Sequence, residues 1–145
     1  MKISSKGRYG LRLMLDLALN KNESPVPLKN ISKRQDISEK YLWHLIPPLK
    51  KACLINVKRG VYGGITLAKE PEEINLLDIV SVLEGNLTMA ECLNNKKKCS
   101  RSDFCTPRDV WSEINNKFLE IFRSYSLKTI MEKEINRNTF FSFEI

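Results

Sequence analysis

The sequence between residues 28 and 67 decides the fold: LKNISKRQDISEKYLWHLIPPLKKACLINVKRGVYGGITL. Apolar residues at helical spacing predict a short helix over residues 28–34. Ser38 is a favourable N-cap for a second helix over residues 39–52, in which Pro47-Pro48 is expected to cause a kink or a shortening. Two short helices joined by a tight turn form a helix-turn-helix.

A β-hairpin follows directly. Residues 53–58 and 65–68 are rich in apolar and β-branched residues, and the basic, Gly-rich turn over residues 59–64 separates them. An ordinary surface hairpin is the alternative. A helix-turn-helix followed by a hairpin with a basic tip predicts a winged helix, so the expected fold is mainly α with a small β-hairpin wing.

Three further helices are expected outside this stretch, over residues 5–20, 75–84 and 107–134, because apolar residues recur there at spacings of three and four. In the first helix, Arg12 and Asp16 have the i,i+4 spacing of an ion pair.

The long C-terminal helix carries a heptad seam of large apolar residues. Thr106 is its expected N-cap, with Pro107 at the first helical position. The seam consists of Trp111, Ile114, Phe118, Ile121 and Tyr125. A lone helix with such a stripe needs a partner, which favours a symmetric homodimer over packing on its own domain.

These elements divide the chain into four expected parts. They are a winged-helix domain over residues 1–85, a cysteine-containing segment over 86–106, a dimerisation helix over 107–134 and an apolar tail over 135–145 that could cover part of the dimer.

The positive charge is concentrated in the first of these parts. The 145-residue chain has a formal net charge of +7. Residues 1–60 carry 13 Lys and Arg against 4 Asp and Glu, a net +9, whereas residues 61–145 carry 11 against 13, a net −2. Such asymmetry indicates a polyanionic partner, most commonly nucleic acid.

The sequence contains no apolar run long enough to span a membrane, and its start lacks the apolar core of a signal peptide. We therefore expect a cytoplasmic protein without a membrane partner. In that compartment the four cysteines would be reduced thiols or metal ligands rather than disulfides.

Three of the cysteines cluster. Cys92, Cys99 and Cys105 follow a C-x6-C-x5-C spacing within 14 residues, and Lys96–Lys98 and Arg101 surround Cys99. Nearby cations and a following helix N-terminus both stabilise thiolates. Thiolates select iron–sulfur clusters, zinc or copper(I), and the spacing matches neither paired zinc knuckles nor a ferredoxin run. A metal site is expected, with unrelated loop cysteines or a thiol switch as alternatives.

Several segments together resemble the bacterial winged-helix regulators that include IscR, NsrR and CymR. They are Met1–Tyr9, Ile37–Leu42, Val57–Gly60, Gly63-Gly64 and Leu83-Glu84-Gly85, and the likeness runs from Met1 to about Lys133. The resemblance implies dimeric transcription regulators, mostly repressors, whose long C-terminal helices cross in the dimer. In several branches three loop cysteines hold an iron–sulfur cluster, at positions that match Cys92, Cys99 and Cys105.

The residues expected to bind DNA lie on three elements. Ser38, Lys40, Tyr41 and His44 would lie in or along the major groove, and Arg59 would enter the adjacent minor groove, where Gly60 allows a close backbone approach. The resemblance further implies phosphate contacts from Ser5, Lys6 and Tyr9.

The chain also departs from the family. Where IscR-like members place a histidine ligand, three residues after the third cysteine, this chain has Arg108, and Arg8 stands where NsrR-like members have a carboxylate. The fourth ligand is therefore open, with Glu91, Asp103, Asp109, water or a small thiol as candidates. CymR-like members lack the three cysteines, which argues against that branch.

The recognition helix differs as well. Trp43-His44 replaces a common Glu-Gln pair. Glutamate accepts a hydrogen bond from cytosine and glutamine suits adenine, whereas Trp43 could only contact a thymine methyl group or pack. The operator preference of relatives is therefore not expected here.

The expected function is a homodimeric transcription repressor whose binding to a double-stranded DNA operator is controlled by an iron–sulfur cluster, 2Fe-2S or 4Fe-4S. The cluster would sense cluster supply, redox state or nitric oxide. One alternative is the same DNA-binding head with a zinc or thiol-based switch instead of a cluster. The other is an iron–sulfur electron carrier, which would not need the basic head. No catalytic triad, phosphate loop or carboxylate pair indicates an enzyme.

Overall fold

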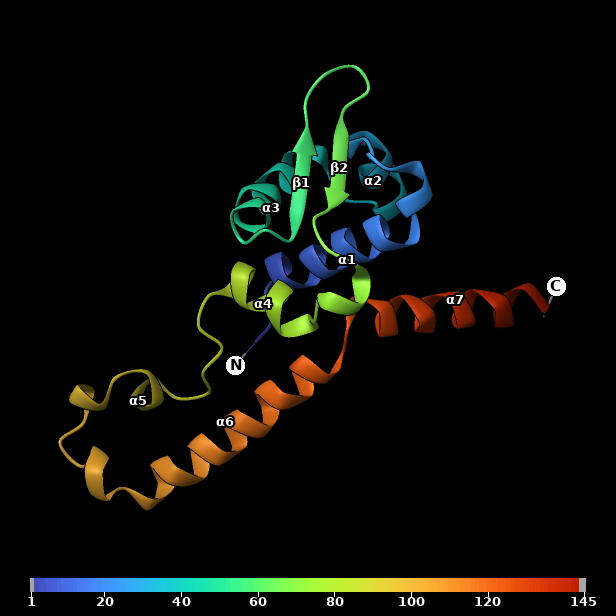
Figure 1. The fold of residues 1–145 in the computed structure, drawn as a ribbon. Helices are drawn as coiled ribbons and strands as arrows, with labels where there is room; N and C mark the ends of the chain where they lie inside the picture. The colour runs from blue at the N-terminus through green and yellow to red at the C-terminus, as the bar shows by residue number, and fades with distance from the viewer. Residues whose placement is uncertain (1, 144–145) are drawn as a thin grey trace.

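The structure is a computed structural model that describes residues 2–143, with side chains up to residue 139. Figure 1 shows a helical head, with the hairpin projecting from it, and two C-terminal helices that leave it. In chain order the elements are α1 (Ser5–Leu19), α2 (Leu28–Gln35), α3 (Glu39–Lys51), β1 (Ile55–Lys58), β2 (Gly64–Leu67), α4 (Leu76–Glu84), α5 (Glu91–Asn94), α6 (Thr106–Ser124) and α7 (Leu127–Phe143), with 3₁₀ turns over Lys21–Glu23, Pro71–Glu73, Lys96–Lys98 and Ser102–Phe104. The predicted fold class, mainly α with a small hairpin, is confirmed.

The head, residues 2–84, is built around α1. One face of α1 is apolar, and its residues Leu13, Met14 and Leu17 are buried against apolar residues from α2, α3, α4 and the hairpin. Burying each such side chain stabilises the fold by roughly 1.5–3 kcal/mol. The position of α2, α3 and the wing is therefore fixed by one shared core.

The helix-turn-helix forms as predicted. Asp36 ends α2 in the left-handed conformation with φ 50°, and the Ser38 side chain accepts a 3.2 Å hydrogen bond from the backbone N–H of Tyr41 at the start of α3. The predicted shortening at Pro47 and Pro48 is wrong, since α3 continues through both residues to Lys51. The carbonyl groups that lose a helical partner belong to exposed residues of α3, where water can hydrogen-bond to them.

The hairpin pairs antiparallel, from Ile55 opposite Leu67 to Lys58 opposite Gly64. Val26, just before α2, extends it by exchanging two backbone hydrogen bonds of 2.8 and 2.9 Å with Ile65. A Cβ on Gly64 would lie 2.5 Å from the Val26 carbonyl oxygen, so this close approach requires glycine. The wing is thereby joined to the helix-turn-helix.

The predicted single helix over residues 107–134 is wrong, because the chain breaks between α6 and α7. At the break, the backbone N–H of Leu76 donates to the carbonyl of Tyr125 (2.8 Å), and that of Leu127 donates to the carbonyl of Ile74 (2.7 Å). Leu127 is fully buried in the head, and Ser126 caps α7 by accepting from the N–H of Thr129. These contacts with the head replace the helical hydrogen bonds that a continuous helix would need.

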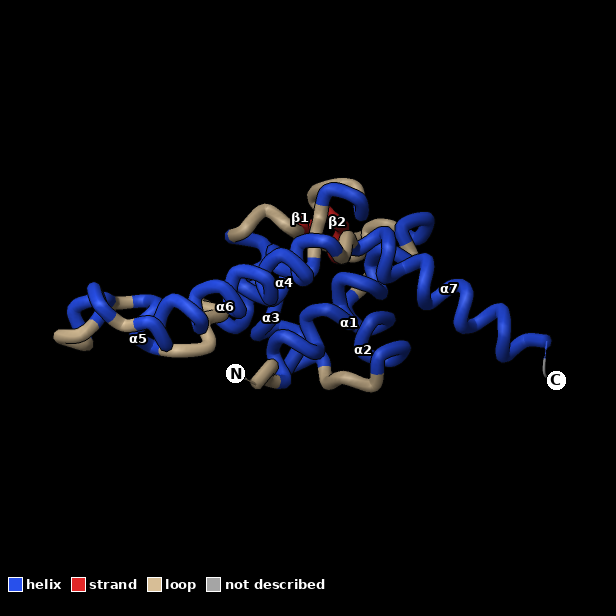
Figure 2. Tube along the Cα trace, turned by 90° about the horizontal axis from the view of Figure 1, so that it is seen from below, coloured by secondary structure: helices blue, strands red, loops and turns tan. Residues whose placement is uncertain are grey.

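Figures 1 and 2 show α6 and α7 leaving the head on opposite sides, with α5 beside the far end of α6. The predicted cap of α6 also differs by one residue, since Cys105 is the N-cap and Thr106 is already helical. The predicted tail over residues 135–145 is helical through Phe143; its last two residues and the side chains from residue 140 lie outside the described part. No helix within residues 2–143 combines the length and apolar character needed to cross a bilayer.

Candidate nucleic-acid interface and cysteine segment

The outer face of α3 carries most of the residues predicted for the major groove. Lys40, Trp43 and His44 are exposed on it, and Tyr41 is half-buried. The hydroxyl of Ser38 is already used as the cap of α3, so its role in the structure is to set the start of this helix. Trp43 is 55% exposed and is not one of the core residues, so about half of its side chain is open to a partner.

The first turns of α1 lie beside α3. Tyr9 of α1 contacts Tyr41 of α3 edge-to-face, with ring centroids 5.4 Å apart, and the guanidinium groups of Arg8 and Arg12 lie 5.8 and 5.5 Å from the Tyr9 ring centroid. Such aromatic and cation–π contacts each stabilise by about 0.5–1.5 kcal/mol. The structure therefore places Tyr9, one of the predicted phosphate contacts, next to Tyr41 of the recognition helix.

The same end of α1 carries the other two predicted phosphate contacts. Lys6 is exposed, whereas the Ser5 hydroxyl accepts a 3.1 Å hydrogen bond from the Arg8 guanidinium. The structure thus groups all three residues at the N-terminal end of α1.

The wing and α3 enclose a groove. Trp43 of α3 lines it together with Val57, Arg59, Gly60 and Val61 of the hairpin. Gly60 has φ 107°, a conformation that residues with a side chain rarely adopt, so glycine is required in the turn. Of the predicted DNA-binding residues, Arg59 and Gly60 of the wing line this groove, whereas α3 contributes Glu39 and Trp43, which were not on the predicted list.

The wing tip contains two exposed residues that the sequence prediction missed. Val61 is 96% and Tyr62 is 88% exposed, so neither side chain packs on the fold. The signal was available in the sequence, because two large apolar residues flanked by glycines inside a predicted turn have no core to join.

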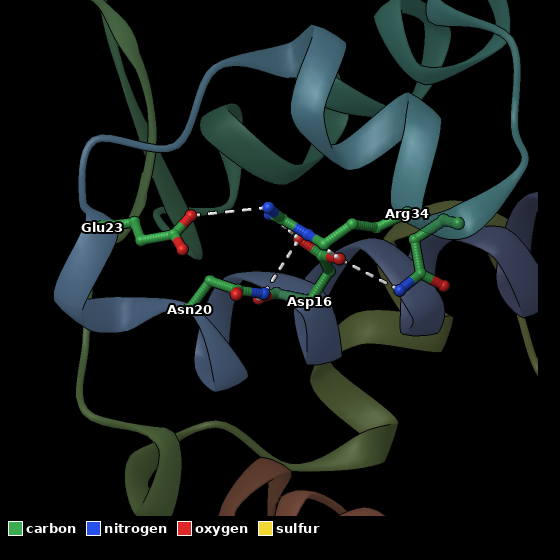
Figure 3. A network of polar contacts seen from close by, with 5 residues as sticks. Asp16, Asn20, Glu23 and Arg34 are labelled. Carbon is green, nitrogen blue, oxygen red and sulfur yellow. Dashed lines mark hydrogen bonds and ion pairs between the residues drawn. The ribbon is translucent and has the colours of Figure 1, made fainter.

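A buried ion pair fixes α2 on α1 (Figure 3). The Asp16 side chain, in a residue only 1% exposed, accepts hydrogen bonds from Arg34 Nε (3.0 Å) and Nη2 (2.7 Å) and from Gln35 Nε2 (3.0 Å). The predicted Arg12–Asp16 pair is wrong, since Arg12 hydrogen-bonds to Gln35 instead. Hydrogen bonding to Asp16 is the main cause that raises the pKa of Arg34 above its usual value.

The cysteine segment is tied to α6 at two points. Arg108 Nε donates a 3.2 Å hydrogen bond to the carbonyl of Cys92, and the backbone N–H of Met89 donates a 3.0 Å hydrogen bond to the buried side chain of Asn115. Arg108, which stands where IscR-like members are expected to have a histidine ligand, therefore holds the backbone of the first cysteine.

The three clustered cysteines are free thiols. Cys92 and Cys105 are half-buried and Cys99 is exposed. Within residues 2–143, no three His, Cys, Asp or Glu side chains lie close enough together to hold a metal ion. Of the candidate fourth ligands, Glu91 pairs with Lys98 at 3.0 Å, and Asp103 and Asp109 are exposed. The ligand set stays a prediction.

Most of the apolar seam of α6 is exposed. Trp111, Ile114, Ile121 and Tyr125 are exposed and Phe118 is half-buried, whereas Asn115 is the buried residue of this helix. The Phe118 and Phe122 rings pack on each other with centroids 4.4 Å apart. The alternative in which the seam packs on its own domain is therefore not what the structure shows.

A helix-turn-helix and a wing on a basic head define a winged-helix DNA-binding regulator. The chain belongs to the Rrf2 family, whose model, described as an iron-dependent transcriptional regulator, matches residues 3–133. It is a family of DNA-binding transcription regulators and not of enzymes, as the sequence predicted.

Named relatives agree with this assignment. The transcriptional regulator CymR of Bacillus subtilis is 41% identical over 87% of this chain and 92% of its own, and IscR of Aliivibrio salmonicida is 36% identical over 90% and 77%. The solved structure of CymR, the global cysteine regulator of B. subtilis, superposes with a TM-score of 0.76 at 37% identity, over 92% of this chain and 98% of its own. The IscR-like branch stays a prediction, because the CymR relative matches at the higher identity.

Proposed function

We propose that this chain acts in the cytoplasm as a homodimeric repressor that binds a double-stranded operator with the surface formed by α3, the wing and the first turns of α1. The observation that carries this proposal is the groove between Trp43 of α3 and Arg59 of the wing, which joins two DNA-contacting elements in one surface. The net +9 of residues 1–60 supplies the attraction to phosphate.

In this proposal each predicted contact has one role. Lys40, Tyr41 and His44 enter the major groove, with Ser38 at the start of the helix. Arg59 enters the adjacent minor groove, and Gly60 allows the wing backbone to come close to DNA.

The phosphate contacts come from the first turns of α1. Lys6 supplies a charge, and Ser5 and Tyr9 supply hydroxyl groups. Tyr9 also packs on Tyr41, so it has a structural role beside its proposed contact.

The dimer is supported by the exposed seam of α6. An apolar stripe along a whole helix is costly to leave in water, and two copies can cover each other's stripe around a two-fold axis. A two-fold pair of winged helices also matches two half-sites of an operator.

Cys92, Cys99 and Cys105 are the residues that would hold an iron–sulfur cluster. The donor set fits in kind, because three free thiols lie on a segment that contains only short helical turns. A cluster bound there would supply an iron-based sensor of cluster supply, redox state or nitric oxide. Arg108 would hold the Cys92 backbone, and Glu91, Asp103 or Asp109 would be the protein candidates for a fourth ligand.

A thiol-based switch is the second candidate. It needs only two of the three free thiols and no metal-binding group, and no such group lies within residues 2–143. Oxidation of two of the thiols by hydrogen peroxide would give a disulfide and two molecules of water. A zinc site on the same thiols is the third outcome of the experiment below.

Anaerobic purification followed by metal and sulfide analysis separates these candidates. Visible absorbance with near-equal iron and sulfide supports a cluster, and colourless protein with zinc supports a zinc site. Colourless, metal-free protein whose DNA affinity responds to peroxide supports the thiol switch. A triple Cys-to-Ser variant at positions 92, 99 and 105 is the control that should lose each signal.

DNA binding itself is tested by titrating a duplex that the protein selects from a random library. Affinity should fall steeply with salt, with a slope set by the number of phosphate contacts. A flat salt response would exclude the DNA-binding proposal.

A further inference from the structure

Glu84, the last residue of α4, binds the N-terminal turn of α1. One carboxylate oxygen, Oε1, accepts hydrogen bonds from the Ser4 backbone N–H (2.9 Å), the Ser4 hydroxyl (2.7 Å) and the Gly7 backbone N–H (2.9 Å). Residues 4 and 84 are far apart in the sequence, so this contact joins two separate elements. We refer to it below as the Glu84 clamp.

The sequence around the clamp is adapted to it. The first turn of α1 contains no acidic residue of its own, so Glu84 provides the negative charge that the N-terminal end of a helix favours. A Cβ on Gly7 would lie 2.5 Å from Glu84 Oε1, so a glycine at position 7 is what lets the carboxylate approach. The family segments that contain Gly7 and Leu83-Glu84-Gly85 thereby meet in one contact.

The clamp lies within the proposed DNA-binding surface. Ser5 and Lys6 stand on the turn that it holds, and Tyr9, one turn further, packs on Tyr41 of the recognition helix. Ser5, Lys6, Tyr41 and Glu84 also line one shared depression. A change in the clamp would therefore move the groups proposed to contact phosphate.

The clamp also lies at the start of the cysteine segment. Gly85 follows Glu84 directly with φ 80°, and residues 86–105 continue to Cys105 at the start of α6. Glu84 is therefore the last helical residue before the cysteine segment, and it also holds the turn of α1 that is proposed to contact DNA.

We propose that Glu84 is a positioning residue for DNA binding: its carboxylate holds the first turn of α1 in the DNA-binding arrangement and links that turn to the state of the cysteine segment. This inference rests on the proposed DNA-binding function. It assigns no direct DNA contact to Glu84.

The sign of the expected effect separates this role from simple charge. A carboxylate near a phosphate-facing turn repels DNA, so charge alone predicts that Glu84→Ala binds DNA more tightly. The clamp predicts weaker binding, because the turn with Ser5 and Lys6 is released. Glu84→Gln keeps the size of the side chain but replaces the charged acceptor with a neutral one, which is the weaker acceptor.

The experiment compares E84A, E84Q and the control E72Q, which removes one charge from an exposed acid outside the clamp. All three variants and the wild-type reference carry Cys53→Ser, so that N-ethylmaleimide modifies only the three cysteines of the segment. Circular dichroism and thermal unfolding first establish that each variant is folded. If E84A does not fold, E84Q replaces it in the comparisons below.

Four readouts follow. Hydrogen exchange of the amides in residues 4–8 should be faster in E84A. Its affinity for the duplex selected by the wild-type protein should fall about tenfold, with a smaller loss in E84Q. The slope of affinity against salt should fall by about 1 if the Lys6 contact is lost. Alkylation of the segment should change the affinity of the wild-type protein and E72Q more than that of E84A.

Wild-type exchange rates in E84A, or DNA binding as tight as that of the wild-type protein or tighter, would overturn the proposal. If the wild-type protein itself shows no salt-dependent DNA binding, the proposed function fails, and the exchange rates still decide whether Glu84 holds the turn.

Discussion

Leu83 occupies the space that a side chain at Gly10 would need: a Cβ on Gly10 would lie 1.9 Å from Cδ1 of Leu83. Gly10 is buried in the middle of α1, where glycine is intrinsically unfavourable. Its presence is explained by the close approach of α4, which brings Leu83 into the core and Glu84 to the end of α1.

Gly10→Ala should therefore destabilise the protein, although alanine is the better helix former. Overpacking of this kind costs about 1–3 kcal/mol, which outweighs a gain of about 1 kcal/mol in helix propensity. Urea unfolding measures the change. In the double variant with Leu83→Ala the two effects should be less than additive, because the smaller side chain removes the clash. Additive effects would show that the two side chains do not compete for this space.

Asp16→Ala should destabilise the protein by about 2–4 kcal/mol, because it removes one partner of a buried ion pair and leaves Arg34 and Gln35 without their acceptor. We expect a loss of stability near the lower end of this range, because the Arg34 side chain is 32% exposed and can be partly hydrated. Glu23→Ala is the matched control: its 3.4 Å pair with Arg34 is exposed, so the expected change is below about 0.5 kcal/mol. Equal effects of the two substitutions in urea unfolding would contradict this assignment.

Arg59→Ala should weaken DNA binding about tenfold and reduce the salt slope by about 1, because it removes the proposed minor-groove cation of the wing. Lys69→Ala removes the same charge at the opposite end of the hairpin and should leave both quantities nearly unchanged. Fluorescence anisotropy with the selected duplex at several salt concentrations measures them. An Arg59→Ala protein with wild-type affinity would remove the wing from the interface.

Ile121→Arg should convert the dimer to a monomer, because it places a charge in the centre of the apolar seam of α6. Asn116→Arg introduces the same side chain on the opposite face of α6 and should leave the dimer intact. Sedimentation equilibrium gives the mass of each variant. A dimeric Ile121→Arg protein would place the two-fold interface elsewhere.

The elements predicted correctly from the sequence have local signals. Ser38 caps α3 by accepting a hydrogen bond from the backbone N–H three residues later, and Gly85 ends α4. The turn residues around Gly60 define the hairpin. Such features depend on neighbours in the chain, so the printed order of residues is sufficient to predict them.

The features that were missed depend on contacts across the fold. Asp16 pairs with Arg34, 18 residues away, rather than with Arg12 on its own helix. The break before Leu127 depends on backbone groups at positions 74 and 76. Helical periodicity continues through the break, so periodicity alone predicts a single helix there.

The candidate site shows the same division. The positions of Lys40, His44 and Arg59 follow from the predicted helix and hairpin, and these residues do lie on exposed parts of α3 and the wing. The Glu84 clamp joins residues 80 positions apart, and no local pattern indicates it.

The junction between α6 and α7 has a further consequence for the operator. Leu127 is buried in the head, and Tyr125 and Leu127 form backbone hydrogen bonds with residues 76 and 74 of the head. These contacts fix the direction in which α6 leaves the head. In the proposed dimer this junction then sets the distance and the relative rotation of the two recognition helices. A dimer that fits half-sites one helical turn apart, about 34–36 Å, would therefore bind poorly to half-sites at other spacings. Adding one base pair between the half-sites rotates one of them by about a tenth of a turn, which a pinned α6 cannot follow. The junction would thus determine which half-site spacing the dimer can bind, although none of its residues needs to contact a base.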